Sequence, residues 1–264
     1  MIAEGKQCYA RGASPCIGAG RTWSGAELNA AITGPVADVV FDDEGTADIA
    51  VILAGVAETE FEHTELARVL ADPDEIEDWR VGEAIAETWL SDHRSCTFPW
   101  PDGRDERKSG SSLPGADLVG FQADDEGDRF AFGEVKTSAE NKYPPQAMYG
   151  RTGLKQQLED LRDQVKIRRD LVKYLGHRAG TAAWRPRYEA ASKRYLANTS
   201  DVQLFGVLIR DVEPHEDDVR VRVDKLAVDC PKGMGIELLA IYLPAGSVAH
   251  LAANALTTRR GGSA

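Results

Sequence analysis

Three residues in the middle of the chain combine reactive side chains with a regular spacing. Asp117 lies in the apolar segment ADLVGF, and Glu134 and Lys136 lie two positions apart in the segment RFAFGEVK. Side chains two apart in a strand point to the same face. The turn sequence DDEGD joins the two segments into a predicted hairpin. Its mirror register would place Asp117 across from Glu134, with the Cβ atoms roughly 5 Å apart.

Two carboxylates at that distance repel each other unless a cation neutralises them. Mg²⁺ or Mn²⁺ prefers oxygen ligands, so Asp117, Glu134 and the carbonyl of Val135 could form the protein half of a metal site. Lys136 would then lie beside the metal or a substrate phosphate. A metal and a lysine placed in this way can hydrolyse a phosphodiester, because they activate water and offset the charge that develops on phosphorus.

The tripeptide Glu-x-Lys alone is a weak signal. It occurs four times, at Glu4/Lys6, Glu106/Lys108, Glu134/Lys136 and Glu140/Lys142. Only the third ends an apolar strand that follows another strand with an Asp at the mirrored position. The pattern around Glu134 is therefore the one that indicates a site.

The surrounding elements are expected in the order helix, weak strand, strand, strand, long helix and strand. We expect helices at Glu60–Leu70, Asp74–Asp92, Gln146–Leu175 and Trp184–Leu196, the long one broken near Gly150 or Gly153. We expect strands at Thr46–Ala57, Cys96–Trp100, Ala116–Phe121, Arg129–Lys136, Val202–Arg210, Val219–Val228 and Gly235–Leu243. Pro101–Ser112 is expected to be a polar loop.

Pro114-x-x-Asp117, a gap of 16 residues and then Glu134-Val135-Lys136 resembles the signature of the PD-(D/E)XK nuclease superfamily. The resemblance implies an α/β fold with a restriction-endonuclease-like α-β-β-β-α-β core, a mixed central sheet and additional N- and C-terminal elements. It also implies Mg²⁺ or Mn²⁺ as cofactor, DNA as substrate and Lys136 as a catalytic residue.

The same resemblance implies further site residues. An acidic residue on the helix before the sheet would be a metal ligand, which matches Glu83 best and Glu87 second. A glutamine on the helix after the lysine strand matches Gln157. Some branches have a tyrosine four residues later, where this chain has Leu161. The chain also resembles, more weakly, the HamA nuclease subunits of the Hachiman anti-phage system, which implies a defence role with a helicase or sensor as partner.

The net charge of −12 is unevenly distributed along the chain. Residues 42–78 contain 13 acidic residues and one basic residue, and residues 151–195 contain 12 Lys/Arg and five Asp/Glu. Either charged stretch could be a solvated face. The basic stretch, which includes Lys155 and Arg162, could bind a phosphate backbone, or it could dock onto the acidic stretch or onto a partner.

The composition is typical of a globular protein, with 42% hydrophobic and 28% charged residues. The N-terminus lacks an apolar signal core and no apolar run is long enough to span a membrane, so we expect a cytoplasmic location and no membrane partner. Four cysteines without a C-x-x-C pair argue against a zinc ribbon. We expect an N-terminal partner-binding or specificity module at 1–72, a nuclease-like domain at 73–245 and a tail at 246–264.

The sequence thus predicts a divalent-metal-dependent nuclease, more specifically an endonuclease acting on DNA, with a partner protein or a homo-oligomer providing tight binding. RNA remains open as a substrate, because no base-reading element is visible. Two alternatives of other classes remain. One is a non-catalytic binding module of the same fold, and the other is an acidic interaction protein that works through residues 42–78.

Overall fold

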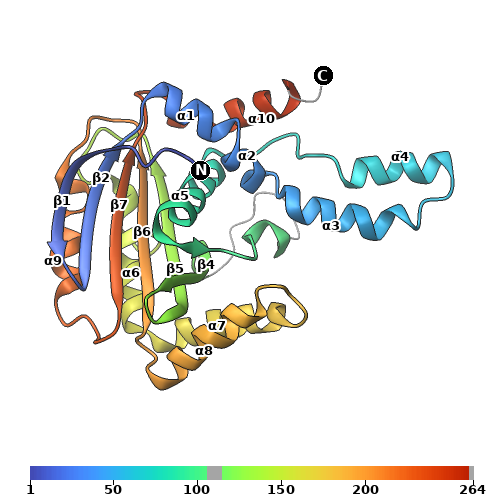
Figure 1. The fold of residues 1–264 in the computed structure, drawn as a ribbon. Coiled ribbons are helices and arrows are strands. Elements are labelled where there is room, and N and C mark those ends of the chain that lie inside the picture. Colours follow the sequence, from blue (N-terminus) through green and yellow to red (C-terminus); the bar gives the residue numbers. More distant parts are fainter. Residues whose placement is uncertain (106–114, 262–264) are drawn as a thin grey trace.

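A seven-stranded mixed sheet forms the centre of the molecule in a computed structural model that describes residues 1–105 and 115–261 (Figure 1). The predicted loop 101–112 and Pro114 lie largely or wholly outside the described residues. In spatial order the strands are β1 (Lys6–Ala13), β2 (Cys16–Thr22), β7 (Gly235–Tyr242), β6 (Val202–Arg210), β5 (Gly127–Ser138), β4 (Leu118–Asp124) and β3 (Cys96–Thr97). The protein is therefore of the mixed α/β class.

The four middle strands run parallel and the outer ones antiparallel. β2, β7, β6 and β5 pair in parallel, and β1, β4 and β3 pair in antiparallel with their neighbours. Every residue of β6 is buried, as its continuous apolar sequence VQLFGVLIR predicts for a strand covered on both faces.

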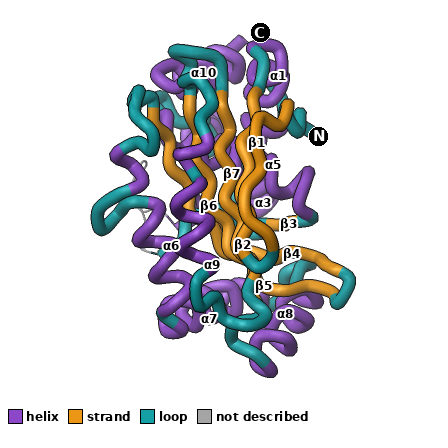
Figure 2. The backbone as a smooth tube through the Cα atoms, turned by 90° about the vertical axis from the view of Figure 1, so that its left-hand side faces the viewer, coloured by secondary structure: helices purple, strands orange, loops and turns teal. Residues whose placement is uncertain are grey.

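Helices cover both faces of this sheet (Figure 1, Figure 2). One apolar core joins the sheet to α1 (Gly25–Ile32), α2 (Pro35–Val40), α5 (Asp78–Arg94) and α10 (Leu251–Gly261). The other core joins the opposite face to α6 (Leu154–Asp163), α7 (Val165–Ala179), α8 (Arg185–Ala197) and α9 (Arg220–Ala227). The remaining helices are α3 (Asp43–Ala54) and α4 (Glu60–Val69), and single 3₁₀ turns lie at Asp102–Asp105, Gln146–Met148, Glu216–Asp218 and Val248–His250.

The predicted buried strand at Thr46–Ala57 is wrong. This segment forms most of helix α3, which Asp42 caps by accepting a hydrogen bond from the backbone of Gly45. With α4 it projects away from the sheet (Figure 1), and Val51 and Ile52 are 79% and 72% exposed. An apolar run of this length fits a strand or a helix equally well, and the alanines and leucine in it favour the helix.

The predicted strand at Val219–Val228 is also wrong, because the segment forms helix α9. Val219, Val223 and Leu226 are all buried against the sheet. Their spacing of four and then three residues is that of a helix face. The valines at 219, 221 and 223 imitate the alternation of a strand.

The other predicted elements are present with shifted ends. The helix expected at Asp74 begins at Asp78, and the edge strand expected at 96–100 is confined to Cys96–Thr97. The long helix expected at 146–175 divides at Gln164 into α6 and α7, and α6 begins directly after Gly153.

Elements outside residues 73–245 share the same sheet and core. β1 and β2 extend the sheet beyond β7, and Ile2 and Trp23 belong to the core that includes α5 and α10. Arg259 of α10 joins both ends of the α3–α4 projection, with bonds of 3.0 Å to Asp43 and 2.7 Å to Asp72. In the described ranges no helix has the length and apolar character needed to cross a bilayer.

Candidate active site

The β4–β5 hairpin has the register that the sequence predicts. Leu118 pairs with Gly133 at one end of the ladder, and Asp124 pairs with Gly127 at the turn. Asp117 is the next residue after the paired segment, so it lies at the end of β4 beside Glu134. Odd residues of β4 and even residues of β5 face α6 and α7, since Val119 and Phe132 belong to the core on that side. Asp117, Glu134 and Lys136 therefore share one face.

The ammonium group of Lys136 lies between the two carboxylates. Its Nζ is 3.6 Å from Oδ2 of Asp117 and 3.5 Å from Oε2 of Glu134. Lys136 is 22% exposed at this point, whereas the Glu134 side chain is 1% exposed. One cation thus offsets part of the charge of two carboxylates, and it does so at the edge of solvent.

Glu134 is a buried carboxyl group without a full set of partners. Burial, followed by repulsion from Asp117, raises the pKa of Glu134 to about 9, although Lys136 acts in the opposite direction. Its Oε1 atom is buried and has no hydrogen-bond partner among the described residues. A carboxyl group in this state binds a proton at neutral pH unless a further cation joins it.

The backbone of Val135 is tied to Asp117. Its N–H donates to Oδ2 of Asp117 at 2.7 Å, in the place where a ladder bond from β4 would otherwise lie. Because the N–H and C=O of one strand residue point to the same side, the carbonyl of Val135 faces the Asp117 side of β5 as well. The carbonyl predicted as a metal ligand therefore points to the correct edge of the strand.

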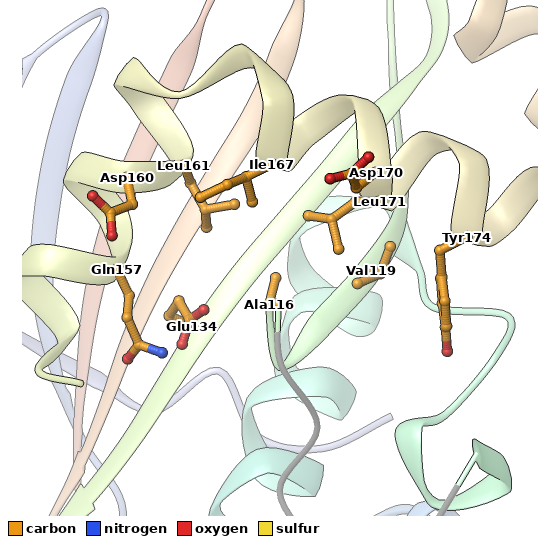
Figure 3. A pocket seen from close by; sticks show the side chains of 11 residues that line it. Ala116, Val119, Glu134, Gln157, Asp160, Leu161, Ile167, Asp170, Leu171 and Tyr174 are labelled. Carbon is orange, nitrogen blue, oxygen red and sulfur yellow. The ribbon is translucent and has the colours of Figure 1, made fainter. Parts of the chain in front are cut away.

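Gln157 of α6 joins this group from across a cavity. Gln157 and Glu134 line the same cavity, of about 570 Å³, and Figure 3 shows the Gln157 side chain extending toward Glu134. The Oε1 atom of Gln157 is buried and has no partner among the described residues. The structure thus brings together four predicted site residues, Asp117, Glu134, Lys136 and Gln157.

Glu83 and Glu87 lie on α5, which packs against the opposite face of the sheet. The helix packs tightly on β5 at Gly82, where a Cβ atom would collide with the side chain of Thr137. Glu83 makes a 3.6 Å ion pair with Arg80, one turn earlier. Through the ranges 1–105 and 115–261, no three His, Cys, Asp or Glu side chains lie close enough together to hold a metal ion. The structure thus places Asp117 and Glu134 on one face of the sheet and the helix that carries Glu83 and Glu87 on the other.

Asp117 and Glu134 nevertheless fit a divalent cation as a two-carboxylate site. Both groups are oxygen donors on one face, and Glu134 has an unpartnered buried oxygen. Mg²⁺ commonly keeps several water ligands and takes only one or two carboxylates from the protein. Two carboxylates and one backbone carbonyl meet that requirement.

Lys155 and Arg162, which the sequence suggests as substrate contacts, do not line this cavity. Lys155 lies 3.8 Å from Glu159. Arg162 donates to Asp163 and to backbone carbonyls of residues 225, 226 and 228, so it connects α6 to the end of α9. Its guanidinium has a structural role in this arrangement.

Several arginines of the basic stretch bind carboxylates of the same chain. Arg178 pairs with Asp105, Arg187 with Asp128, and Arg194 with Asp124 and Asp201. None of these acidic partners lies in the stretch 42–78. Lys166, Arg169 and Lys173, by contrast, are exposed on α7. Their spacing of three and four residues places them on one face of the helix.

The sequence analysis did not identify Asp160, Asp170 and Tyr174, which also line the cavity. A signal for them exists in the helical spacing. Asp160 follows Gln157 by three residues on α6, and positions 167, 170, 171 and 174 form one face of α7. Because the helix is interrupted at Gln164, the lining residues of α6 and α7 do not follow one continuous helical spacing in the sequence.

No protein-family model matches this chain, and no curated protein matches it.

Proposed function

We propose that the protein is a divalent-metal-dependent nuclease of the restriction-endonuclease-like class, acting on DNA. The observation that carries the proposal is the group of Asp117, Glu134 and Lys136 on one face of the hairpin, with Glu134 buried and one of its oxygens unpartnered. A cation would remove the repulsion that raises the pKa of Glu134.

The topology supports this proposal. The order α5, β3, β4, β5, α6 to α8 and β6 follows the α-β-β-β-α-β core expected from the resemblance. β3, β4, β5 and β6 are also neighbours in the sheet, and β5 and β6 run parallel because three helices connect them. Asp117, directly before β4, and Glu134 of β5 lie next to each other in this arrangement.

The chain's own groups have definable roles in phosphodiester hydrolysis. Asp117, Glu134 and the Val135 carbonyl would hold Mg²⁺ or Mn²⁺, which stabilises negative charge on the phosphate and activates water. Lys136, freed from part of its contact with the carboxylates, would orient the attacking water and offset charge on the phosphate. Gln157 would position Lys136 or the phosphate. Asp117 also fixes the backbone of Val135.

The wider biological role is an analogy with the family that the chain resembles. We propose an antiviral effector of the Hachiman type, in which a helicase or sensor protein, or a second copy of the chain, supplies recognition. All four cysteines are free thiols. Free thiols persist in reducing compartments, which supports our proposal of a cytoplasmic location.

A non-catalytic binding module of the same fold is the second candidate. The observation in its favour is that no group of three metal-binding side chains is found in the part of the chain that the structure describes. Such a module would bind nucleic acid or a protein partner without cleaving it.

Cleavage by the purified protein distinguishes the two candidates. Supercoiled DNA, linear DNA and single-stranded RNA are each incubated with Mg²⁺, Mn²⁺ or EDTA. We expect metal-dependent cleavage of DNA, with nicking of closed circles if the enzyme is an endonuclease. Binding without cleavage under all metal conditions would favour the module, and cleavage of RNA alone would correct the substrate.

A further inference from the structure

The cavity beside Glu134 extends well beyond the two carboxylates. It measures about 570 Å³ and lies between the β4–β5 hairpin and helices α6 and α7 (Figure 3). Its walls are largely apolar and come from Ala116, Val119, Leu161, Ile167 and Leu171. Tyr174, whose hydroxyl donates to Asp105, closes the end farthest from Gln157. This volume is within the range of cavities that hold small organic groups.

The charged groups that line the cavity are carboxylates. Asp160 and Asp170 lie on α6 and α7, and no lysine or arginine is found among the described lining residues. The Oδ1 atom of Asp160 accepts hydrogen bonds from the side-chain amides of Gln156 and Gln164, which hold this carboxylate in place. A phosphate would be repelled here, whereas a flat neutral group with N–H donors would be accepted.

Basic side chains lie on the neighbouring face of α7. Lys166, Arg169 and Lys173 are exposed. Each directly precedes a cavity-lining residue, namely Ile167, Asp170 and Tyr174. Successive residues of an α-helix are separated by about a quarter-turn around its axis. The three basic side chains therefore lie next to the cavity-lining side chains on the helix surface. A nucleic-acid strand whose phosphates contact this basic face could turn one base into the cavity.

We propose that the cavity receives an unstacked nucleobase that carries an exocyclic amine, from the strand whose phosphodiester lies at Lys136. Asp170 accepts a hydrogen bond from the amine, and the apolar walls contact the ring. This inference rests on the proposed function, because it takes a nucleic-acid strand as the substrate. It predicts that single-stranded or locally unpaired DNA is bound in preference to a continuous duplex.

The test uses 2-aminopurine, an amine-bearing base whose fluorescence rises when it leaves the base stack. It is placed at successive positions of a single-stranded oligonucleotide and of a duplex, and each is titrated with the full chain in EDTA, where no cleavage occurs. We expect the fluorescence to rise several-fold when 2-aminopurine occupies one particular position of the single-stranded oligonucleotide.

Two variants assign that signal to the cavity. Ile167→Phe fills the cavity and should abolish the rise, whereas Val228→Phe, at a residue that is 61% exposed and does not line the cavity, should leave it unchanged. Asp170→Asn, at an exposed position, retains the shape but removes a charged acceptor, so the rise should weaken several-fold.

Absence of a rise at every position would overturn the inference, and so would an equal rise in Ile167→Phe. Binding of free 2-aminopurine riboside without any signal from the strand would also overturn it, because the cavity would then be a nucleoside site. A rise in EDTA from a protein that never cleaves with Mg²⁺ would support the cavity and reject the nuclease. Cleavage with Mg²⁺ but no rise in fluorescence in EDTA would support the nuclease and reject the cavity as a nucleobase site.

Discussion

The carboxylate of Asp117 accepts a 2.7 Å hydrogen bond from the backbone N–H of Val135, between Glu134 and Lys136. This bond connects the end of β4 to the centre of the Glu-x-Lys segment. It fixes where the carbonyl of Val135 points and holds the two carboxylates on one face. Asp117 therefore has a structural role that is separable from any role in metal binding.

Substitution at Asp117 should separate these two roles. Asp117→Asn keeps an oxygen acceptor for Val135 and should change the free energy of unfolding only slightly. Asp117→Ala leaves the N–H of Val135 without its partner and should cost about 1–3 kcal/mol. Chemical denaturation in EDTA measures both. Equal stability of the two variants would show that the bond contributes little.

Glu134 should make the stability of the protein depend on pH. Its pKa is about 9 in the folded protein, against an ordinary value of 4.5. The proton that the folded state retains contributes stability that is fully present below the unfolded pKa of 4.5 and is lost as the pH rises toward 9. Without metal, the wild type should become less stable over this window relative to Glu134→Gln, which does not titrate.

The expected gain of Glu134→Gln over the wild type is on the order of 2–4 kcal/mol at about pH 7.5, measured by denaturation in EDTA. Glu126→Gln, on the exposed turn of the hairpin, serves as a control and should show no such gain. Mg²⁺ should then stabilise the wild type and not the Glu134 variant. If the difference in stability between the wild type and Glu134→Gln does not change with pH, Glu134 is already ionised in the folded protein.

Apolar residues of α3 should tolerate polar substitution. Val51→Ser and Ile52→Ser change side chains that are 79% and 72% exposed, so each should alter the free energy of unfolding by no more than about 0.5 kcal/mol. Val207→Ala in the fully buried strand β6 should cost about 1–3 kcal/mol. Similar large losses for all three would indicate that α3 is packed against protein.

The hairpin and its paired residues could be predicted because local rules determine them. A turn sequence sets the register, and the two-residue period of a strand sets the face, so Asp117, Glu134 and Lys136 follow from the sequence. The strands at 202–210 and 235–243 were equally predictable, since nearly continuous apolar runs between helices are typical of buried parallel strands.

Other features depend on tertiary contacts that no local pattern reports. The run at 46–57 is apolar enough for a core strand, yet it lies on a projecting helix with its valine and isoleucine side chains exposed. The cavity depends on how α6 and α7 meet after Gln164, which brings Asp160 and Asp170 to one space. The hairpin β1–β2 joins the sheet through pairing with β7, more than 200 residues away in sequence.

The central claim is that Asp117 and Glu134 hold the cation while Lys136 acts on the substrate. The most direct measurement follows Mn²⁺ binding by electron paramagnetic resonance and DNA cleavage on the same protein samples. It compares the wild type with Glu134→Gln, Lys136→Ala and, as a control from another Glu-x-Lys segment, the exposed Lys142→Ala.

Lys136→Ala should bind Mn²⁺ at least as tightly as the wild type, because its ammonium group no longer competes at 3.5–3.6 Å from both carboxylates, yet it should not cleave. Glu134→Gln should lose both activities, and Lys142→Ala should retain both. Cleavage by Lys136→Ala at the wild-type rate, or undiminished Mn²⁺ binding by Glu134→Gln, would contradict the account.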